Sequence, residues 1–146
     1  MAEVVSIRPA VRKDAALCAG ILNDWIDALD WVPRVHAHDD VTAFYQDVVF
    51  EKRDLFVAGD PVTGFVALDC EAEFVSALYV ATPGQGTGKQ LLDFAKRGAD
   101  ALELWTFQLN DGARRFYKRE GFEETRTTDG DNEEGLPDVL CRWERA

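Results

Sequence analysis

Residues 78–92 read Leu-Tyr-Val-Ala-Thr-Pro-Gly-Gln-Gly-Thr-Gly-Lys-Gln-Leu-Leu, so that an apolar run passes through a glycine-rich turn into a second apolar stretch. Gly84, Gly86 and Gly88 alternate along the turn, and glycine lets the backbone approach a ligand closely because no Cβ stands in the way. A helix that begins there would offer free N–H groups and the positive end of its dipole to a phosphate. The stretch predicts a site for a phosphorylated ligand; a turn that only ends the strand is the alternative interpretation.

Two common phosphate-binding motifs do not fit this turn. A P-loop places four residues between its first glycine and a Gly-Lys pair, followed by Ser or Thr. Here three residues separate Gly84 from Gly88, and Gln90 follows Lys89. A dinucleotide fold needs Gly-x-Gly-x-x-Gly in an N-terminal βαβ unit, with an acidic residue about 20 positions further on. The glycine spacing differs from that motif, and the turn lies in the middle of the chain.

A second motif follows an apolar run at residues 102–107. Residues 110–122 read Asn-Asp-Gly-Ala-Arg-Arg-Phe-Tyr-Lys-Arg-Glu-Gly-Phe. Together the two stretches resemble the GNAT superfamily of acetyl-CoA-dependent N-acetyltransferases. In that family a strand ending in Val leads to a loop (Gln/Arg)-x-x-Gly-x-(Gly/Ala), and a later helix opens on Asn and ends in Phe-Tyr-x-x-x-Gly-Phe. The resemblance extends from about residue 6 to the C-terminus, although the first third matches only in layout. Pro83 stands where the family has Gln or Arg, and the loop is about two residues shorter.

Hydrophobic periodicity and turn signals outline the elements of the whole chain. Helices are expected at residues 12–29, 40–50, 86–101 and 111–119, and strands at 4–8, 55–58, 63–68, 74–80, 103–107, 122–126 and 139–143. This order is also that of the GNAT fold. The resemblance therefore implies an α+β fold with a mixed, mostly antiparallel sheet, splayed at one parallel strand pair and covered by helices on both faces.

Length and composition limit the classes of protein that the chain can belong to. With 146 residues, 47% of them hydrophobic, residues 1–146 suit one domain with one core. A net charge of −11 argues against a nucleic-acid partner, because that affinity comes mainly from Lys and Arg. The acidity attracts a cationic substrate or simply keeps the protein soluble, and composition leaves both open.

Targeting and cysteine signals indicate a cytoplasmic protein. No apolar run reaches the length of a membrane span, and the N-terminus has neither a basic region nor a cleavage pattern, so we expect no membrane partner. Cys18, Cys70 and Cys141 are dispersed and have apolar neighbours. We interpret them as reduced core residues rather than a disulfide, a metal site or a nucleophile, and we expect no metal.

The resemblance assigns acetyl-CoA as the cosubstrate and a set of residues that hold it. Backbone N–H groups of the loop would face the pyrophosphate, and backbone groups of the splayed strand would hold the pantetheine arm and polarise the acetyl carbonyl. The loop residues are Gly84, Gln85, Gly86, Thr87, Gly88 and Lys89, and the strand residues are Leu78 and Val80. Asn110 would cap the later helix, contact the cofactor, or do both.

The resemblance also places the acid and the base. Tyr117 matches the tyrosine that protonates the departing thiolate; its alternative role is packing beside Ala113 and Phe116. The glutamate that serves many members as base would fall at Phe74, next to Glu73. Because strand residues alternate faces, Glu73 reaches the amine only if a bulge changes the register, and otherwise it is a solvated carboxylate.

An acceptor site is expected between the first two helices, where the family builds it. Arg34 and His36 would bind a substrate carboxylate or relay a proton, or they would cap the second helix. Residues 129–134 carry four carboxylates and would steer a cationic amine, unless the loop is an unstructured solvated turn.

The function that these expectations describe is transfer of acetyl from acetyl-CoA to a primary amine of a small molecule or peptide, by direct attack in a ternary complex. The alternative is a GNAT-fold module that binds acyl-CoA as a sensor or interaction partner without efficient catalysis. A homodimer is left open by the sequence.

Overall fold

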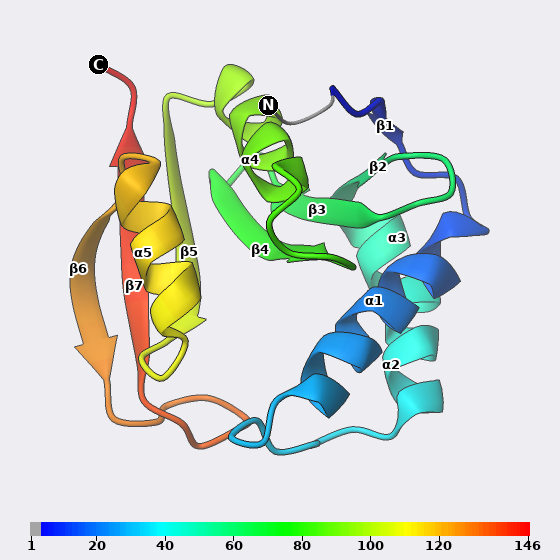
Figure 1. Ribbon diagram of the computed structural model, residues 1–146, viewed down its shortest axis with the longest axis horizontal. Coiled ribbons are helices and arrows are strands. Elements are labelled where there is room, and N and C mark those ends of the chain that lie inside the picture. Colours follow the sequence, from blue (N-terminus) through cyan, green and yellow to red (C-terminus); the bar gives the residue numbers. More distant parts are fainter. Residues whose placement is uncertain (1–3) are drawn as a thin grey trace.

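The computed structural model describes residues 4–146, and its centre is one seven-stranded sheet (Figure 1). The strands lie in the order β1-β2-β3-β4-β5-β7-β6, and all neighbours are antiparallel except β4 and β5. Their bounds are β1 Ile7–Pro9, β2 Asp54–Ala58, β3 Gly64–Asp69, β4 Phe74–Val80, β5 Ala101–Phe107, β6 Glu123–Thr128 and β7 Asp138–Glu144. The helices are α1 Asp14–Ala28, α2 His38–Phe44, a π-helical segment η1 Tyr45–Val49, α3 Phe50–Lys52, α4 Thr87–Arg97 and α5 Asp111–Arg119.

Two separate cores cover the two faces of the sheet, because alternate strand residues point to opposite sides. On β3, Val66 and Leu68 pack in the core that contains α4 and α5, whereas Phe65 and Ala67 pack in the core of α1, α2 and η1. Figure 1 shows α1 and α2 beside β2 and β3, and α5 over β5 and β7. Helices therefore lie on both faces, as the sequence predicted.

The parallel strands β4 and β5 separate almost as soon as they meet. Their register contains a single pair, Phe74↔Glu103, and Figure 1 shows the two strands diverging beyond it. Between β3 and β4 the register passes from Ala67↔Ala77 to Leu68↔Val75, so that Ser76 forms a bulge in β4. A bulge bends and twists its strand, which turns β4 away from β5. The predicted mixed sheet with a splayed parallel pair is confirmed.

Element boundaries depart from the sequence predictions where a tertiary contact decides them. The helix predicted at residues 86–101 ends at Arg97, where Arg145 donates from Nη2 to the carbonyls of Lys96 and Ala99 at 2.5 and 2.7 Å. Such bonds satisfy the free carbonyls of a helix C-terminus. The second helix begins at His38 rather than residue 40 and contains a π segment.

The cysteine prediction is correct for two of the three positions. Cys18 and Cys141 are buried, whereas Cys70 is exposed in the turn between β3 and β4, so its assignment to the core was wrong. Of the N-terminal segment used in the targeting argument, residues 1–3 lie outside the described residues. No helix within residues 4–146 is long and apolar enough to cross a membrane.

Candidate active site

The glycine turn after β4 presents its backbone to open space. Gly84 and Gly86 have φ angles of +84° and +78°, in the left-handed region that side chains disfavour. Gly86 is the N-cap of α4, and the first amide bonded within the helix is that of Gln90, which donates to the Gly86 carbonyl at 3.1 Å. The amides of residues 87–89 therefore have no acceptor inside the helix, and they form an anion-binding terminus.

The open edge of β4 supplies a second row of free backbone groups. Ala81 donates to the Thr63 carbonyl at 2.7 Å, and antiparallel strands alternate between bonded and non-bonded pairs. Tyr79 therefore bonds to β3, while the amides and carbonyls of Leu78 and Val80 point toward β5. Because β5 has moved away beyond Phe74, these groups face the gap between the strands.

A cavity of about 1390 Å³ fills this gap and continues to α1 and α2. Its cofactor end is formed by the end of β4, the glycine turn and α5, and its acceptor end by α1, α2 and residues 131–134. Predicted site residues that line it are His36, Leu78, Val80, Gly84, Gly86, Gly88, Lys89, Asn110 and Tyr117. Arg34, Glu73, Gln85 and Thr87 are absent from its lining. Thr87 is buried with 6% of its surface exposed, so only its backbone amide is available at the turn.

All three tyrosines of the chain line this cavity: Tyr45, Tyr79 and Tyr117. Tyr117 is 8% exposed, and burial raises the pKa of its phenol well above the ordinary value near 10. Its hydroxyl makes no hydrogen bond to a described residue. Since no buried side-chain oxygen in residues 4–146 lacks a partner, this oxygen is open to the cavity. Tyr117 is thus a protonated donor aimed into the gap.

The gap brings together tyrosines from opposite faces of the sheet. Tyr117 belongs to the core under α4 and α5, whereas Tyr79 packs in the core under α1. The charge of Tyr79 nevertheless contributes to the raised pKa of Tyr117, after the larger effect of burial. Both side chains line the cavity in the gap between β4 and β5.

Asn110 and Arg115 add polar groups at the cofactor end. Asn110 is the N-cap of α5, and its Oδ1 accepts from the Ala113 amide at 3.0 Å, which leaves Nδ2 free for the cavity. Arg115 is exposed, lines the cavity and forms no ion pair with another described residue. Sequence reasoning assigned no role to Arg115, although it lies within the second motif.

Glu73 lies at the closed end of the β4–β5 pair rather than in the cavity. Its Oε2 accepts from the amides of Asp100 and Ala101 at 2.9 and 3.2 Å, and its own carbonyl accepts from Glu103 at 3.0 Å. A left-handed φ of 53° turns its side chain to the start of β5. The bulge is at Ser76, beyond Glu73, and so does not bring this carboxylate to the gap. The geometry gives Glu73 a structural task at the start of β5, outside the cavity.

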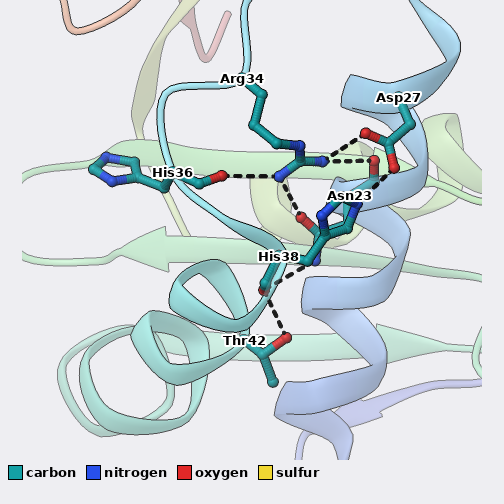
Figure 2. A network of polar contacts seen from close by, with 6 residues as sticks. All are labelled: Asn23, Asp27, Arg34, His36, His38 and Thr42. Atoms are coloured by element: carbon teal, nitrogen blue, oxygen red, sulfur yellow. Dashed lines mark hydrogen bonds and ion pairs between the residues drawn. The ribbon is translucent and has the colours of Figure 1, made fainter.

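The Arg34 side chain forms hydrogen bonds within α1 and the segment between α1 and α2 (Figure 2). Its guanidinium donates to Asn23 Oδ1 at 3.0 Å, to the His36 carbonyl at 3.0 Å and to Asp27 Oδ1 at 2.8 Å. His38 Nε2 meets the other oxygen of Asp27 at 2.7 Å. Since these bonds use the guanidinium to fix the loop, the expected role of Arg34 in binding a substrate carboxylate is not supported. Figure 2 shows the His36 ring pointing away from this network.

The His36 ring instead connects two distant loops. Its Nε2 lies 3.0 Å from Glu133 Oε2, across the acceptor end of the cavity. The β6–β7 loop is also ordered internally: the buried Asp138 accepts from Thr128 and from Asn132 Nδ2, the latter at 3.0 Å, and Asn132 Nδ2 also reaches the Leu136 carbonyl at 2.8 Å. Residues 129–134 thus form a hydrogen-bonded turn in which three of the four carboxylates, those of Asp129, Asp131 and Glu133, are exposed.

Aromatic rings form a wall beside the acceptor end. This aromatic wall consists of Trp25, Trp31, Tyr79 and Phe107, with successive ring centroids 6.2 Å apart for Trp25–Trp31, 5.2 Å for Trp25–Tyr79 and 5.8 Å for Trp31–Phe107. The last contact joins the α1–α2 segment to the end of β5, across the splay. Each residue had an apolar signal in the sequence, but their convergence depends on contacts between distant segments.

Comparison with known proteins agrees with this architecture. The acetyltransferase (GNAT) domain family matches residues 51–124, half of the chain. An uncharacterized N-acetyltransferase of Methanocaldococcus jannaschii is 39% identical over 90 residues, which span 51% of this chain and 39% of that protein. The peptidyl-lysine N-acetyltransferase YiaC of Escherichia coli is 27% identical over 128 residues, covering 80% of this chain and 82% of that one.

A solved structure extends the likeness to the part that the family model leaves out. The structure of yncA from Salmonella typhimurium, solved with its cofactor acetyl-CoA, matches 97% of this chain and 94% of that one. Its TM-score is 0.70 at 22% sequence identity, so the likeness concerns the fold. On the family match and on the splayed sheet with its glycine turn, the chain belongs to the GNAT family of acetyl-CoA-dependent N-acetyltransferases.

Proposed function

We propose that this protein transfers the acetyl group of acetyl-CoA to a primary amine of a small molecule or a peptide, by direct attack within a ternary complex. The observation that carries the proposal is the cavity in the β4–β5 gap, which is bordered by free amides of α4 and lined by Tyr117. The peptide alternative is supported by the similarity to YiaC, which acts on peptidyl-lysine.

The cofactor would lie along the open edge of β4. Its pyrophosphate suits the amides of residues 87–89, because the helix dipole and the unbonded N–H groups both favour an anion. Arg115 would add a positive charge, and Asn110 Nδ2 a further donor. The pantetheine arm, which carries amide groups, would complete the ladder that Leu78 and Val80 lack on the side of β5. We keep the backbone of Gln85 and Thr87 in this set, since the amides rather than the side chains are required.

The chemistry requires a neutral amine, a polarised thioester and an acid for the leaving group. The amine nitrogen attacks the acetyl carbonyl, the C–N bond forms, and the C–S bond then breaks. Tyr117 would protonate the departing thiolate, because burial keeps its phenol protonated and its hydroxyl faces the gap. No cysteine lines the cavity among the described residues, which favours direct attack over an acetyl-enzyme.

Two measurements test the proposal together. Acetyl-CoA at one hundred times its Kd should stabilise the fold by about 2.7 kcal/mol, which raises the Tm by roughly 5–10 °C for a chain of this size. A screen of amines should then show thiol release that depends on both acetyl-CoA and the amine. A protein that is stabilised by acetyl-CoA but releases no thiol with any amine would be a binding module, and the proposed transfer would be wrong.

A further inference from the structure

The acceptor end of the cavity is strongly acidic. Where the cavity is lined by α2, the loop before it and residues 126–138, five carboxylates and two basic side chains face it; the acids are Asp40, Asp131, Glu133, Glu134 and Asp138, and the bases are His36 and Arg126. Such a surface attracts a cation and repels a carboxylate. The charge at this end therefore favours an acceptor that arrives as an ammonium ion with no carboxylate beside it.

One carboxylate in this group is partly buried and has no hydrogen-bond or ion-pair partner among the described residues. Glu133 is paired with His36, and Asp138 is bonded to Thr128 and Asn132. Asp40 and Asp131 are exposed. Glu134 is half-buried and forms no hydrogen bond or ion pair with another described residue.

Glu134 lines the same cavity as Tyr79 and Tyr117. Burial, and after it the negative charge of Glu134, raise the pKa of Tyr79 to about 12. Tyr117 is 8% exposed and has its hydroxyl open to the same cavity. The cavity in the β4–β5 gap thus joins an unpaired carboxylate to the tyrosine proposed as the acid.

The space between these groups is lined by apolar side chains. Trp25, Tyr79 and Phe107 of the aromatic wall line the cavity, and so do Phe44 and Val35, which are 53% and 45% exposed. Aromatic faces attract cations as well as apolar groups. An ammonium on an apolar stem therefore suits both the walls and the charge.

The cations at this end offer little to a substrate carboxylate. Arg34 is absent from the lining and is bonded to Asn23, Asp27 and the His36 carbonyl. His36 faces Glu133. Arg126 forms no ion pair with another described residue, and its guanidinium lies over the Trp105 ring, 5.8 Å from the centroid. Only Arg126 could receive a carboxylate, and it is therefore the control for this inference.

Given the proposed acetyl transfer, we propose that the acceptor is a primary ammonium on an uncharged apolar stem without a neighbouring carboxylate, and that Glu134 receives this ammonium and takes its proton. An N–H bond of the ammonium breaks, an O–H bond forms on Glu134, and the neutral amine attacks the thioester. The nitrogen loses two protons overall. One leaves to solvent through Glu134. The other passes from the acylated nitrogen to the Tyr117 phenolate, which restores the phenol after it has given its proton to the CoA sulfur. Glu134 would thus act as a catalytic residue, whereas the sequence analysis expected only a steering role for the carboxylates of residues 129–134.

The first experiment compares acceptors by thiol release with acetyl-CoA held at saturation. Phenethylamine, phenylalanine and phenylalaninamide share one aromatic stem and differ in the carboxylate, and ethanolamine lacks the apolar stem. Nα-acetyl-lysine methylamide presents the same chemistry from a peptide source, so its rank against phenethylamine shows which source the site prefers. We expect kcat/KM for phenethylamine or the lysine derivative to exceed that for phenylalanine and ethanolamine by at least about tenfold.

The second experiment removes one charge at two positions of the same loop. Glu134→Gln should lower kcat/KM for the best amine by about 10²–10⁴-fold and leave the KM for acetyl-CoA unchanged. Asp129→Asn is the matched control, because Asp129 is exposed and absent from the cavity lining. The loss in Glu134→Gln should shrink as the pH rises toward the pKa of the free amine near 10, since more amine then arrives neutral. A purely structural defect would not be rescued in this way.

Distinct outcomes overturn the inference and the proposed function. Preference for phenylalanine over phenethylamine, abolished by Arg126→Gln, would show that the site selects a carboxylate and would overturn the acceptor class. Equal losses of kcat/KM in Glu134→Gln and Asp129→Asn would show that Glu134 contributes only a negative charge to the loop and does not take the proton. If acetyl-CoA binds but no amine of any class releases thiol, the proposed transfer itself fails, and this inference fails with it.

Discussion

The substitution Tyr117→Phe separates the chemistry of the cavity from its packing. The ring of Tyr117 lies 5.1 Å from that of Phe116 and 5.5 Å from that of Phe122, and phenylalanine retains both contacts. The hydroxyl that is lost donates to no described residue. We therefore expect the Tm and the affinity for acetyl-CoA to stay unchanged, because removing a hydroxyl without a protein partner leaves no orphaned group behind.

Turnover should respond very differently. General acid catalysis contributes about 10²–10⁴-fold, which at about 1.36 kcal/mol per tenfold corresponds to about 2.7–5.4 kcal/mol of transition-state stabilisation. The wild-type kcat should show no basic limb from Tyr117 below pH 10, because burial raises the pKa of this phenol and the acid form persists. The assay is single-turnover thiol release at saturating amine, so that chemistry limits the rate.

Tyr45→Phe provides the control, since it removes the same atom from another tyrosine of the cavity. Tyr45 is 4% exposed and packs against Phe65 with ring centroids 5.6 Å apart. Its hydroxyl takes part in none of the transfer steps, and we expect a change in kcat smaller than about threefold. If Tyr117→Phe retains the wild-type single-turnover rate, Tyr117 only packs, and the thiolate obtains its proton from another group.

Three further changes test the parts that hold the site. Gly86→Ala forces a side chain into a φ of +78°, which should lower the stability of the fold by about 1–2 kcal/mol and also weaken CoA binding. Acetyl-pantetheine, which lacks the pyrophosphate, should bind as before. Gly98→Ala is the matched control, because Gly98 has a φ of −97° and open space around it. Asp138→Asn should loosen residues 129–137, seen as faster amide exchange there and a higher KM for the amine, with the Kd for CoA unchanged. Asp14→Asn should lower the Tm at pH 7, because the hydrogen bond from Arg8 lowers the pKa of this buried carboxyl. That stability is present above the ordinary pKa near 4 and is lost as the pH falls through the lowered folded value, so the two Tm curves should converge in acid; a constant gap would contradict the linkage.

The cofactor half of the site could be predicted because its geometry is local. Left-handed φ angles at Gly84 and Gly86, the helix start after them and the cap by Asn110 depend on residues within a few positions of one another. Such features leave a direct mark on the sequence, namely glycine where φ is positive and Asn where a helix begins. The order of strands and helices was predictable for the same reason.

The acceptor half could not be predicted, because long-range contacts build it. Trp31 meets Phe107, and His36 meets Glu133, although each pair is separated by more than seventy residues. The position of the Glu73 carboxylate could not be predicted for a different reason. A strand places side chains by parity, so the bulge at Ser76 and the left-handed φ of Glu73 decide where a carboxylate points. Neither feature has a reliable signal in one sequence.

Different segments of the chain form the acceptor end and the cofactor end of the cavity, so we expect acceptor preference to change without a change in cofactor affinity. The Trp31–Phe107 contact joins residues 29–37 to the end of β5, and the His36–Glu133 contact joins them to the loop after β6. None of these residues belongs to the glycine turn. The turn, in contrast, is fixed by its own φ angles and by the start of α4. Substitutions at distant sites without shared partners act independently. His36→Ala should therefore change the ranking of amines by kcat/KM while the Kd for CoA, measured by calorimetry, stays within about twofold of wild type. A parallel loss of CoA affinity would show that the contact across the acceptor end also holds the two halves of the sheet at the spacing that the cofactor requires.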